Sequence, residues 1–316
     1  MKKILVVSYT QTGQLGAIVK SLIAPVQGRS DIEVTHAIIR PRTAFPFPWP
    51  LWRFFNTFPE TVYAEAGPIE PLDIDASAEF DLIILAYQVW FLSPSLPIQA
   101  FLQSEQAKTL LRNKSVITVI GCRNMWLMAQ ERTKQLLLDL GARLIDNVVL
   151  TDRTHVAATF ISTPLWMLTG KRGPFLGGLV PAAGIPAEDI ADVARFGRAI
   201  AAQLPARASD STEPMFQGLG AVTVNPRMIA SEKIALRSFR IWGGWLRALG
   251  DQQSLARKCL LFFYVIFLVT LILTVVPVSA IIKRLLMPFM RERVQLQRNY
   301  FAAPSGEDAS AWRVQS

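Results

Sequence analysis

The sequence predicts an α/β protein with a doubly wound, five-stranded parallel sheet. Three observations lead to this prediction. Five short apolar segments alternate with helical patterns across residues 1–204. Some of these segments are almost continuously apolar, which is typical of strands that helices cover on both faces. Most connections between them are short, which favours crossovers to neighbouring strands.

The first expected strand runs into the polar turn TQTGQ, after which apolar residues recur at helical spacing. A closing helix is expected after Pro186, because Glu188 and Asp189 would lie in its first turn. The expected strands cover residues 3–9, 33–40, 80–87, 115–121 and 143–150. The expected helices cover residues 15–26, 98–111, 127–140 and 187–204. Such sheets bind ligands beyond the carboxyl ends of their strands.

Two insertions interrupt the alternation, and both follow strand ends on the ligand side of the sheet. Residues 41–71 are rich in Pro and aromatic residues and cannot form one regular element. Residues 154–186 include the apolar stretch TPLWML. Their aromatic side chains either pack into the core, as most do, or wall a hydrophobic pocket for a long apolar substrate.

A polar linker is expected over residues 205–233, and a basic amphipathic helix over residues 234–250. One face of that helix carries Trp242 and Trp245, and another face carries three arginines. Such a helix suits a membrane interface. An ordinary helix packed on the surface of a domain has the same pattern, so this alternative stays open.

Residues 259–282 contain no charged residue and have Lys and Arg on both sides. At ~1.5 Å per residue they would extend roughly 36 Å as a helix, enough to cross a bilayer core of ~30 Å. Pro277 would kink a spanning helix or bend a segment that dips into one leaflet. The prediction is a transmembrane or membrane-dipping helix, with a buried soluble helix as the alternative. A basic tail with a disordered end is expected over residues 283–316.

Charge and cysteine content restrict the class of protein. Lys and Arg number 33 against 24 Asp and Glu, a net charge of +9, and the excess gathers from Arg227 onward. This placement favours anionic lipid headgroups over nucleic acid. Two cysteines, Cys122 and Cys259, are too few for a metal cluster, so no metal site is expected. The N-terminal apolar run is short for a signal peptide, so the expected location is the inner membrane, with the domain facing the cytoplasm.

The turn after the first strand has the composition of a phosphate-binding loop. Hydroxyl and backbone N–H groups at a helix N-terminus bind a phosphate dianion without Lys or Arg. The run TQTGQL resembles the phosphate loop of flavodoxin-like proteins, with Leu15 in place of a final hydroxyl residue. The loop consists of Thr10, Gln11, Thr12, Gly13, Gln14 and Leu15.

Two further loops fall where flavodoxins contact the flavin ring. The first follows the third strand and consists of Gln88, Val89, Trp90 and Phe91. The second follows the fourth strand and includes Gly121, Cys122, Arg123, Asn124 and Trp126. The resemblance covers residues 1–204 and implies a flavodoxin-like fold that binds FMN.

The runs FPFPWPLWRFF, AYQVWFLSPSLPI and CRNMWLMAQE, together with the apolar C-terminal segment, resemble bacterial dialkylresorcinol condensing enzymes. The resemblance implies a partner ketosynthase and an acyl carrier protein that supply a lipid-like dialkylcyclohexanedione. A flavin-dependent oxidoreductase of the dehydrogenase or aromatase type would remove two hydrogens to give a 2,5-dialkylresorcinol. No Cys, His and Asn in ketosynthase arrangement is evident, so condensation itself is not expected.

The candidate catalytic residues are Arg123, Asn124 and His155. Arg123 would hold an enolate electrostatically, and His155 would titrate near neutrality. An ordinary ion pair or loop cap explains each of them at least as well. Two other functions stay open: a membrane-bound flavodoxin-like NAD(P)H-quinone reductase, and a non-catalytic membrane scaffold for a ketosynthase. A homo-oligomer is compatible with the sequence.

Overall fold

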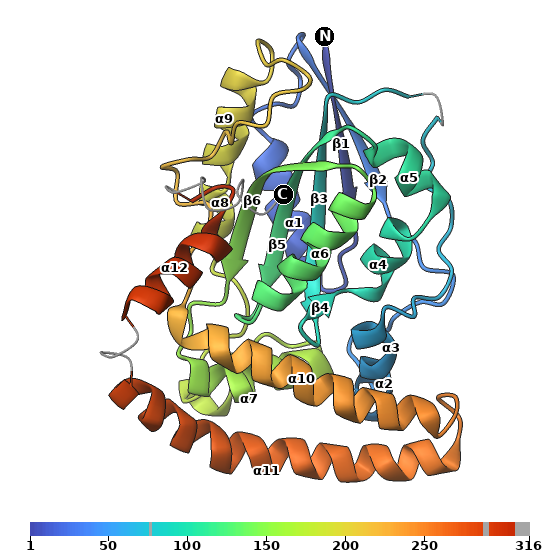
Figure 1. Ribbon diagram of the computed structural model, residues 1–316, viewed down its shortest axis with the longest axis vertical. Helices are drawn as coiled ribbons and strands as arrows, with labels where there is room; N and C mark the ends of the chain where they lie inside the picture. Colours follow the sequence, from blue (N-terminus) through green and yellow to red (C-terminus); the bar gives the residue numbers. More distant parts are fainter. Residues whose placement is uncertain (76–77, 287–290, 307–316) are drawn as a thin grey trace.

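The computed structural model describes residues 1–75, 78–286 and 291–306 (Figure 1). Its parallel strands lie in the order β2-β1-β3-β5-β6. They are β1 (Lys2–Ser8), β2 (Ile32–Ile38), β3 (Leu82–Trp90), β5 (Ser115–Cys122) and β6 (Arg143–Thr151). The two-residue strand β4 (Ser93–Pro94) pairs antiparallel with the end of β3. The strand order reverses between β1 and β3, as in flavodoxin-like folds, so the predicted fold class is confirmed.

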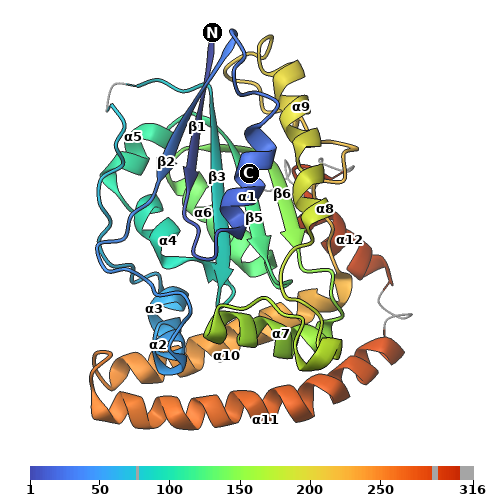
Figure 2. The ribbon, with the colours of Figure 1, turned by 180° about the vertical axis from the view of Figure 1, so that it is seen from behind.

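Helices cover both faces of the sheet (Figures 1 and 2). One face carries α1 (Gln14–Ile23), α8 (Ala187–Asp192) and α9 (Ala194–Gln203). The other carries α4 (Leu96–Leu102), α5 (Glu105–Leu111) and α6 (Leu127–Asp139). Neighbouring residues of β1 point into different cores, Leu5 into one and Val6 into the other. Helices on both faces therefore explain why the central strands are apolar throughout.

Two helices that the sequence predicts as continuous are broken. The expected helix 98–111 divides into α4 and α5, because the Ser104 hydroxyl accepts a 3.1 Å hydrogen bond from Ala107 N and starts a new helix. The expected helix 187–204 divides into α8 and α9 next to Val193. On α9, a Cβ at Gly197 would lie 2.0 Å from Leu22 O, so glycine allows α9 to pack directly on α1.

The two insertions form short helices beyond the carboxyl ends of the strands. Residues 41–71 contain α2 (Leu51–Asn56) and α3 (Phe58–Tyr63). Residues 154–186 contain α7 (Val156–Thr169) and the 3₁₀ helix Leu176–Gly178. These segments lie where the strand arrows point in Figure 1 and cover the ligand edge of the sheet.

The C-terminal third forms α10 (Pro226–Ala248), α11 (Leu255–Leu286) and α12 (Arg291–Ala302). α10 begins at Pro226 and not at residue 234, because the Asn225 side chain accepts a 3.1 Å hydrogen bond from Arg227 N. Part of the expected linker is therefore helical. α10 and α11 form an antiparallel hairpin across the carboxyl ends of the strands, and α12 returns to the domain (Figures 1 and 2). The tail end, 307–316, where disorder is expected, lies outside the described residues.

Candidate functional site

The three loops that the sequence predicts as ligand-binding lie at the carboxyl edge of the sheet, around the switch point between β1 and β3. Tyr9, at the end of β1, contacts Trp90, at the end of β3, with ring centroids 6.1 Å apart. Gly121, at the end of β5, lies next to α1, since a Cβ there would be 3.3 Å from Leu15 Cδ1. The fold therefore brings the three segments to one edge.

The loop between β1 and α1 is open to solvent and keeps backbone donors uncommitted. Gly13 N donates to Thr10 Oγ1 at 3.1 Å, and Gln14 N donates to Thr12 Oγ1 at 3.4 Å. The loop and first-turn N–H groups with no acceptor among the described residues are those of Gln11, Thr12, Leu15 and Gly16. Gly13 is exposed and has φ 81°, a backbone conformation that favours glycine. An amide-rich turn at the start of a ten-residue helix attracts an anion.

Two glutamine side chains fix this loop to the insertions. The Gln14 amide donates to Ile185 O at 3.1 Å and accepts from Ile185 N at 3.2 Å. Gln11 Nε2 donates to Pro46 O at 2.9 Å. The Leu15 side chain is buried in the core with α1, so only its main chain faces the loop. The predicted loop residues thus divide into open backbone donors and side chains with structural partners.

Three of the four residues that the sequence predicts as a loop after the third strand belong to that strand, β3. Gln88, Val89 and Trp90 are the last residues of β3, because the antiparallel pairing of Val89 with Pro94 extends the strand. Phe91 then turns the chain with φ 47°. Trp90 is buried and packs against aromatic rings of the first insertion. The ring centroids of Phe45 and Trp49 lie 5.0 and 5.6 Å from that of Trp90.

One polar atom inside this aromatic cluster lacks a partner. Trp49 is 3% exposed, and its Nε1 donor has no hydrogen bond among the described residues. Buried donors without partners cost free energy and are uncommon, so each one is a place to look for a missing ligand. This indole N–H lies beside Trp90, at the edge where the sequence predicts the flavin ring.

The loop after β5 brings two of the predicted catalytic residues into contact. Arg123 Nε donates to Asn124 Oδ1 at 3.3 Å, and the guanidinium lies 4.4 Å from the ring centroid of Phe160 on α7. Burial lowers the pKa of Arg123 and raises the pKa of the Cys122 thiol. Cys122 is therefore a protonated thiol and not an activated nucleophile. The predicted ring-contact residue Trp126 is buried in the core at the start of α6.

The third predicted catalytic residue, His155, is exposed at the start of α7, where its carbonyl oxygen accepts from Ala158 N at 2.9 Å. The nearby carboxylate of Asp152 is structural. Its two oxygens accept from Thr154 N and Gly184 N, both at 2.8 Å, and so connect the end of β6 to the second insertion.

Glu232 on α10 is a buried carboxylate that the sequence analysis does not identify. Glu232 Oε2 accepts a 3.1 Å hydrogen bond from Met128 N in the first turn of α6, while Oε1 has no partner among the described residues. Burial raises the pKa of Glu232 to about 8, and the amides of the α6 N-terminus oppose that shift. Its sequence signal is a single acid on an otherwise basic helix, three residues after the buried Ile229.

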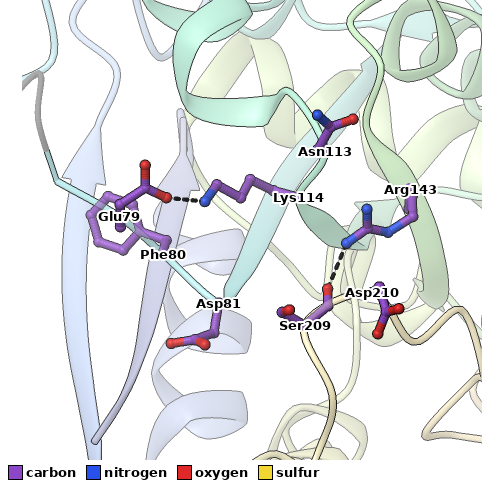
Figure 3. Close-up of a pocket in the computed structure, with 8 residues that line it drawn as sticks. All are labelled: Glu79, Phe80, Asp81, Asn113, Lys114, Arg143, Ser209 and Asp210. Carbon is purple, nitrogen blue, oxygen red and sulfur yellow. Dashed lines mark hydrogen bonds and ion pairs between the residues drawn. The ribbon is translucent and has the colours of Figure 1, made fainter.

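Two cavities of the molecule lie away from these loops. Figure 3 shows the first, of about 440 Å³, at the amino-terminal ends of the strands. There Lys114 pairs with Glu79, and Arg143 Nη2 donates to Ser209 O at 2.6 Å, so these two cations have partners within the protein. The second, of about 630 Å³, lies between α6, α10 and α12. The described residues contain no group of three or more His, Cys, Asp or Glu that could hold a metal ion.

Comparisons with known proteins give structural neighbours only. No protein-family model and no curated protein matches the chain. A flavoprotein in complex with FMN from Lactobacillus acidophilus is 16% identical, with a TM-score of 0.38, over 47% of this chain and 93% of that one. A WrbA-like flavodoxin from Agrobacterium tumefaciens is 12% identical, with a TM-score of 0.32, over 63% and 98%. Two-electron reduced Megasphaera elsdenii flavodoxin is 18% identical, with a TM-score of 0.27, over 46% and 84%. The fold assignment depends on the strand order described above and not on these scores.

Proposed function

We propose that the protein is an FMN-dependent oxidoreductase that works at the inner membrane and aromatises a 2,5-dialkylcyclohexane-1,3-dione to a 2,5-dialkylresorcinol. The observation that carries the flavin assignment is the open loop between β1 and α1. It offers uncommitted backbone donors and hydroxyl groups at a helix N-terminus and contains no Lys or Arg. This donor set suits a phosphate monoester such as that of FMN.

The remaining edge residues fit the rest of the cofactor. The loop residues Thr10 to Gly16 would hold the phosphate, and the end of β3 and the loop after β5 would hold the ring. The unpartnered indole N–H of Trp49 supplies a donor at the ring side. Bound FMN would supply a two-electron acceptor, which the protein side chains lack.

An apolar, membrane-associated substrate is supported by a series of aromatic contacts. Neighbouring ring centroids in this series are 4.6 to 5.7 Å apart. The rings, from α11 to the end of β3, are Tyr264, Phe58, Phe91, Phe54, Trp49 and Trp90. The edge of the sheet is thus joined to the apolar helix α11 by a continuous apolar wall, which favours a lipid-like substrate over a polar one.

The chain's own residues would contribute electrostatics and a proton acceptor. Arg123, held by Asn124 and Phe160, would stabilise the enolate of the dione. His155, exposed at the start of α7, would accept the ring proton. The oxidation removes a hydride and a proton from neighbouring ring carbons, and the packed aromatic surroundings would exclude water. A ketosynthase and an acyl carrier protein would supply the dione.

The first test is whether the protein binds FMN. Purified full-length protein in detergent should show the absorption bands of bound flavin, or acquire them when titrated with FMN. The variant Thr10→Val, which removes a loop hydroxyl, should bind FMN more weakly, while Thr109→Val on α5 should not change the affinity. A colourless protein that does not bind added FMN would refute the flavin assignment and favour a membrane scaffold.

The second test separates the two redox functions. Stopped-flow absorbance should show that the dione alone bleaches the oxidised flavin, with the resorcinol as product. Bleaching by NAD(P)H without the dione, followed by reoxidation with a quinone, would instead identify a quinone reductase. The two results exclude each other as the main activity.

A further inference from the structure

α11 has the composition of a membrane-spanning helix, but its surroundings in the fold decide how it can meet a membrane. Within Leu255–Ser279, the most apolar window of 18 residues has a mean hydropathy of 2.9, and only 12% of this window is buried. A helix that crosses a bilayer once places the segments before and after it on opposite sides. The contacts of those two segments therefore determine whether α11 crosses.

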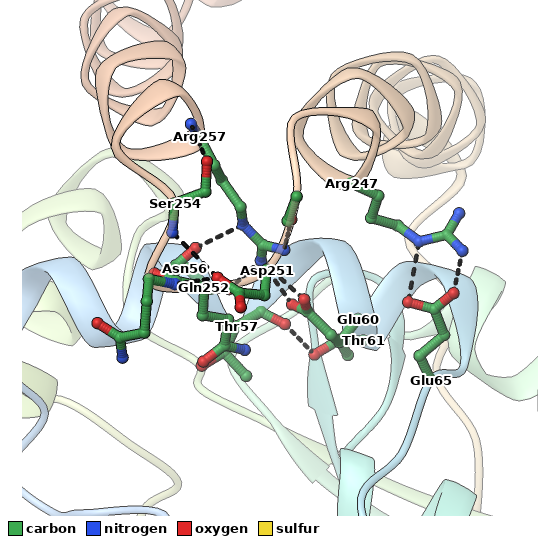
Figure 4. A network of polar contacts seen from close by, with 12 residues as sticks. Asn56, Thr57, Glu60, Thr61, Glu65, Arg247, Asp251, Gln252, Ser254 and Arg257 are labelled. Atoms are coloured by element: carbon green, nitrogen blue, oxygen red, sulfur yellow. Dashed lines mark hydrogen bonds and ion pairs between the residues drawn. The ribbon is translucent and has the colours of Figure 1, made fainter.

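The first end of α11 is fastened to the α/β domain by a buried arginine, which Figure 4 shows between α11 and the first insertion. Arg257 is 1% exposed. Its Nε donates to Asn56 Oδ1 at 2.8 Å, and Nη2 donates to Asn56 O at 2.8 Å and to Glu60 Oε2 at 2.9 Å. A buried cation without these partners would be costly, so this end of the helix is held on α2 and α3.

The segment after α11 packs on the same domain. The Ser305 hydroxyl accepts from Asn147 N at 2.6 Å and donates to Asp146 Oδ1 at 2.9 Å, both on β6. Tyr300 OH on α12 donates to a carboxylate oxygen of Glu131 on α6 at 2.6 Å. Both ends of α11 therefore lie on the side of the domain, and α11 cannot cross a bilayer while these contacts hold.

The neighbour of α11 also opposes a spanning orientation. α11 packs along α10, with the Trp242 ring centroid 5.3 Å from that of Tyr264 and 5.0 Å from that of Phe267. If α11 stood across the bilayer, α10 beside it would enter the hydrocarbon as well. α10 exposes Arg237 and Arg240 near its middle, and charged side chains are costly at that depth.

The outward face of α11 is apolar and continues onto its neighbours. Its exposed large apolar residues include Phe262, Phe263, Ile266, Phe267, Val269 and Leu273. Trp52 on α2 extends this face, with its ring centroid 6.2 Å from that of Phe262. Residues of α10 turn by ~100° each, so the exposed Ile241 and Trp245 form a stripe next to Trp242, which contacts α11. The exposed Arg237 and Arg240 lie on the side of α10 away from Trp242.

We propose that the α10–α11 hairpin is a monotopic anchor that lies parallel to the membrane. The outward face of α11 enters one leaflet, Trp52 and Trp245 lie at its boundary, and the arginines of α10 contact anionic headgroups. The anchor places the carboxyl edge of the sheet against the lipid surface, where an apolar substrate would enter. It rests on the membrane attachment in the proposed function and is independent of the flavin.

Cysteine labelling tests the orientation. In a Cys122→Ser, Cys259→Ser background, Ser30→Cys reports the domain and Arg293→Cys reports α12, and both positions are exposed. A membrane-impermeant maleimide should label both variants in inverted inner-membrane vesicles and neither in intact spheroplasts. Labelling of Arg293→Cys only from the periplasmic side would show that α11 crosses, and would overturn the proposal.

Vesicle flotation tests the docking face with a matched pair of variants. Phe263 on α11 is 61% exposed and Leu138 on α6 is 60% exposed, so neither variant disturbs a core. Phe263→Asp should bind vesicles of phosphatidylglycerol and phosphatidylethanolamine at least tenfold more weakly, and Leu138→Asp should bind like the unmodified chain. Pure phosphatidylcholine vesicles should bind all three proteins more weakly.

Equal flotation of the two variants would overturn the anchor. Flavin content is read from the absorbance of the same fractions. If the protein floats as expected but contains no flavin, the anchor stands and the proposed oxidoreductase fails. If flavin is present and the protein does not float, the oxidoreductase stands and the anchor fails.

Discussion

The two ends of the ligand edge differ in how far they are prepared for a ligand. At the β1–α1 end, several backbone N–H groups have no acceptor among the described residues, and Gln11 and Gln14 hold the loop in place. At the β3 end, Trp90 is buried against rings of the first insertion, whose centroids lie 5.0 and 5.6 Å from its own. The proposed phosphate binding would therefore depend on one loop alone. The proposed ring binding would depend on how α2, α3 and the C-terminal hairpin pack.

The largest expected effect at the β3 end comes from removing its buried cation. We call this part of the ligand edge, formed by the end of β3, α2, α3 and the C-terminal hairpin, the aromatic end. Arg257→Ala leaves Glu60 and Asn56 without their partner beneath the hairpin. Removal of one member of a buried pair costs about 3–5 kcal/mol, so we expect a loss of this size in the free energy of unfolding. Chemical denaturation in detergent, followed by tryptophan fluorescence, measures it.

The matched control for this variant is Arg247→Ala on α10. Arg247 pairs with Glu65, but the two side chains are 33% and 45% exposed. An exposed ion pair contributes about 0–1 kcal/mol, so this variant should be almost as stable as the unmodified chain. Equal losses in the two variants would show that Arg257 does not hold the hairpin in place.

A second prediction concerns the carboxylate that joins α10 to α6 between the two ends. Burial raises the pKa of Glu232 to about 8 from its ordinary value near 4.5. Its contribution to stability is therefore fully present below about pH 4.5 and is lost as the pH rises toward 8. Glu232→Gln cannot ionise and keeps an acceptor for Met128 N.

We expect the Gln variant to exceed the unmodified chain in stability above pH 8 by roughly 4–5 kcal/mol, and the difference to vanish near pH 4.5. Denaturation midpoints measured from pH 4.5 to 9 test this. A difference that does not change with pH would mean that Glu232 is ionised throughout this range and is stabilised by the α6 N-terminus.

The sequence predicts the sheet and the turn into α1 well, because both depend on local patterns. A few neighbouring residues specify each apolar strand, the glycine turn in TQTGQL and the start of α1. The aromatic end depends on contacts between distant segments. Phe58 on α3 stacks on Tyr264 of α11 with a centroid distance of 4.6 Å, and no spacing rule connects residues so far apart.

The charged residues of the hairpin show the same limit. Arg257 flanks an uncharged run, and the sequence alone predicts one more basic residue at a membrane boundary. In the structure it is buried against Glu60, which lies in a segment whose Pro and aromatic content gives no regular pattern. Glu232 likewise has the sequence pattern of an ordinary helix residue, and only the fold places it at the α6 N-terminus.

A smaller effect on stability, and a direct test of the loop between β1 and α1, comes from a pair of glycines. Gly13 and Gly28 have φ of 81° and 73°, and a Cβ would meet no atom within 4 Å at either position. Alanine in this conformation costs roughly 1–2 kcal/mol, so Gly13→Ala and Gly28→Ala should lose similar stability in thermal unfolding. Only Gly13 lies in the open loop, since Gly28 follows the far end of α1.

The two variants should therefore separate in FMN titrations. Gly13→Ala displaces the amides that would bind the phosphate, and a loss of about 1 kcal/mol corresponds to a roughly fivefold higher Kd. Gly28→Ala carries the same backbone strain without touching those amides, so its Kd should equal that of the unmodified chain. If both variants weaken binding equally, FMN affinity depends on the stability of the whole domain. In that case the loop between β1 and α1 is not a preformed phosphate site.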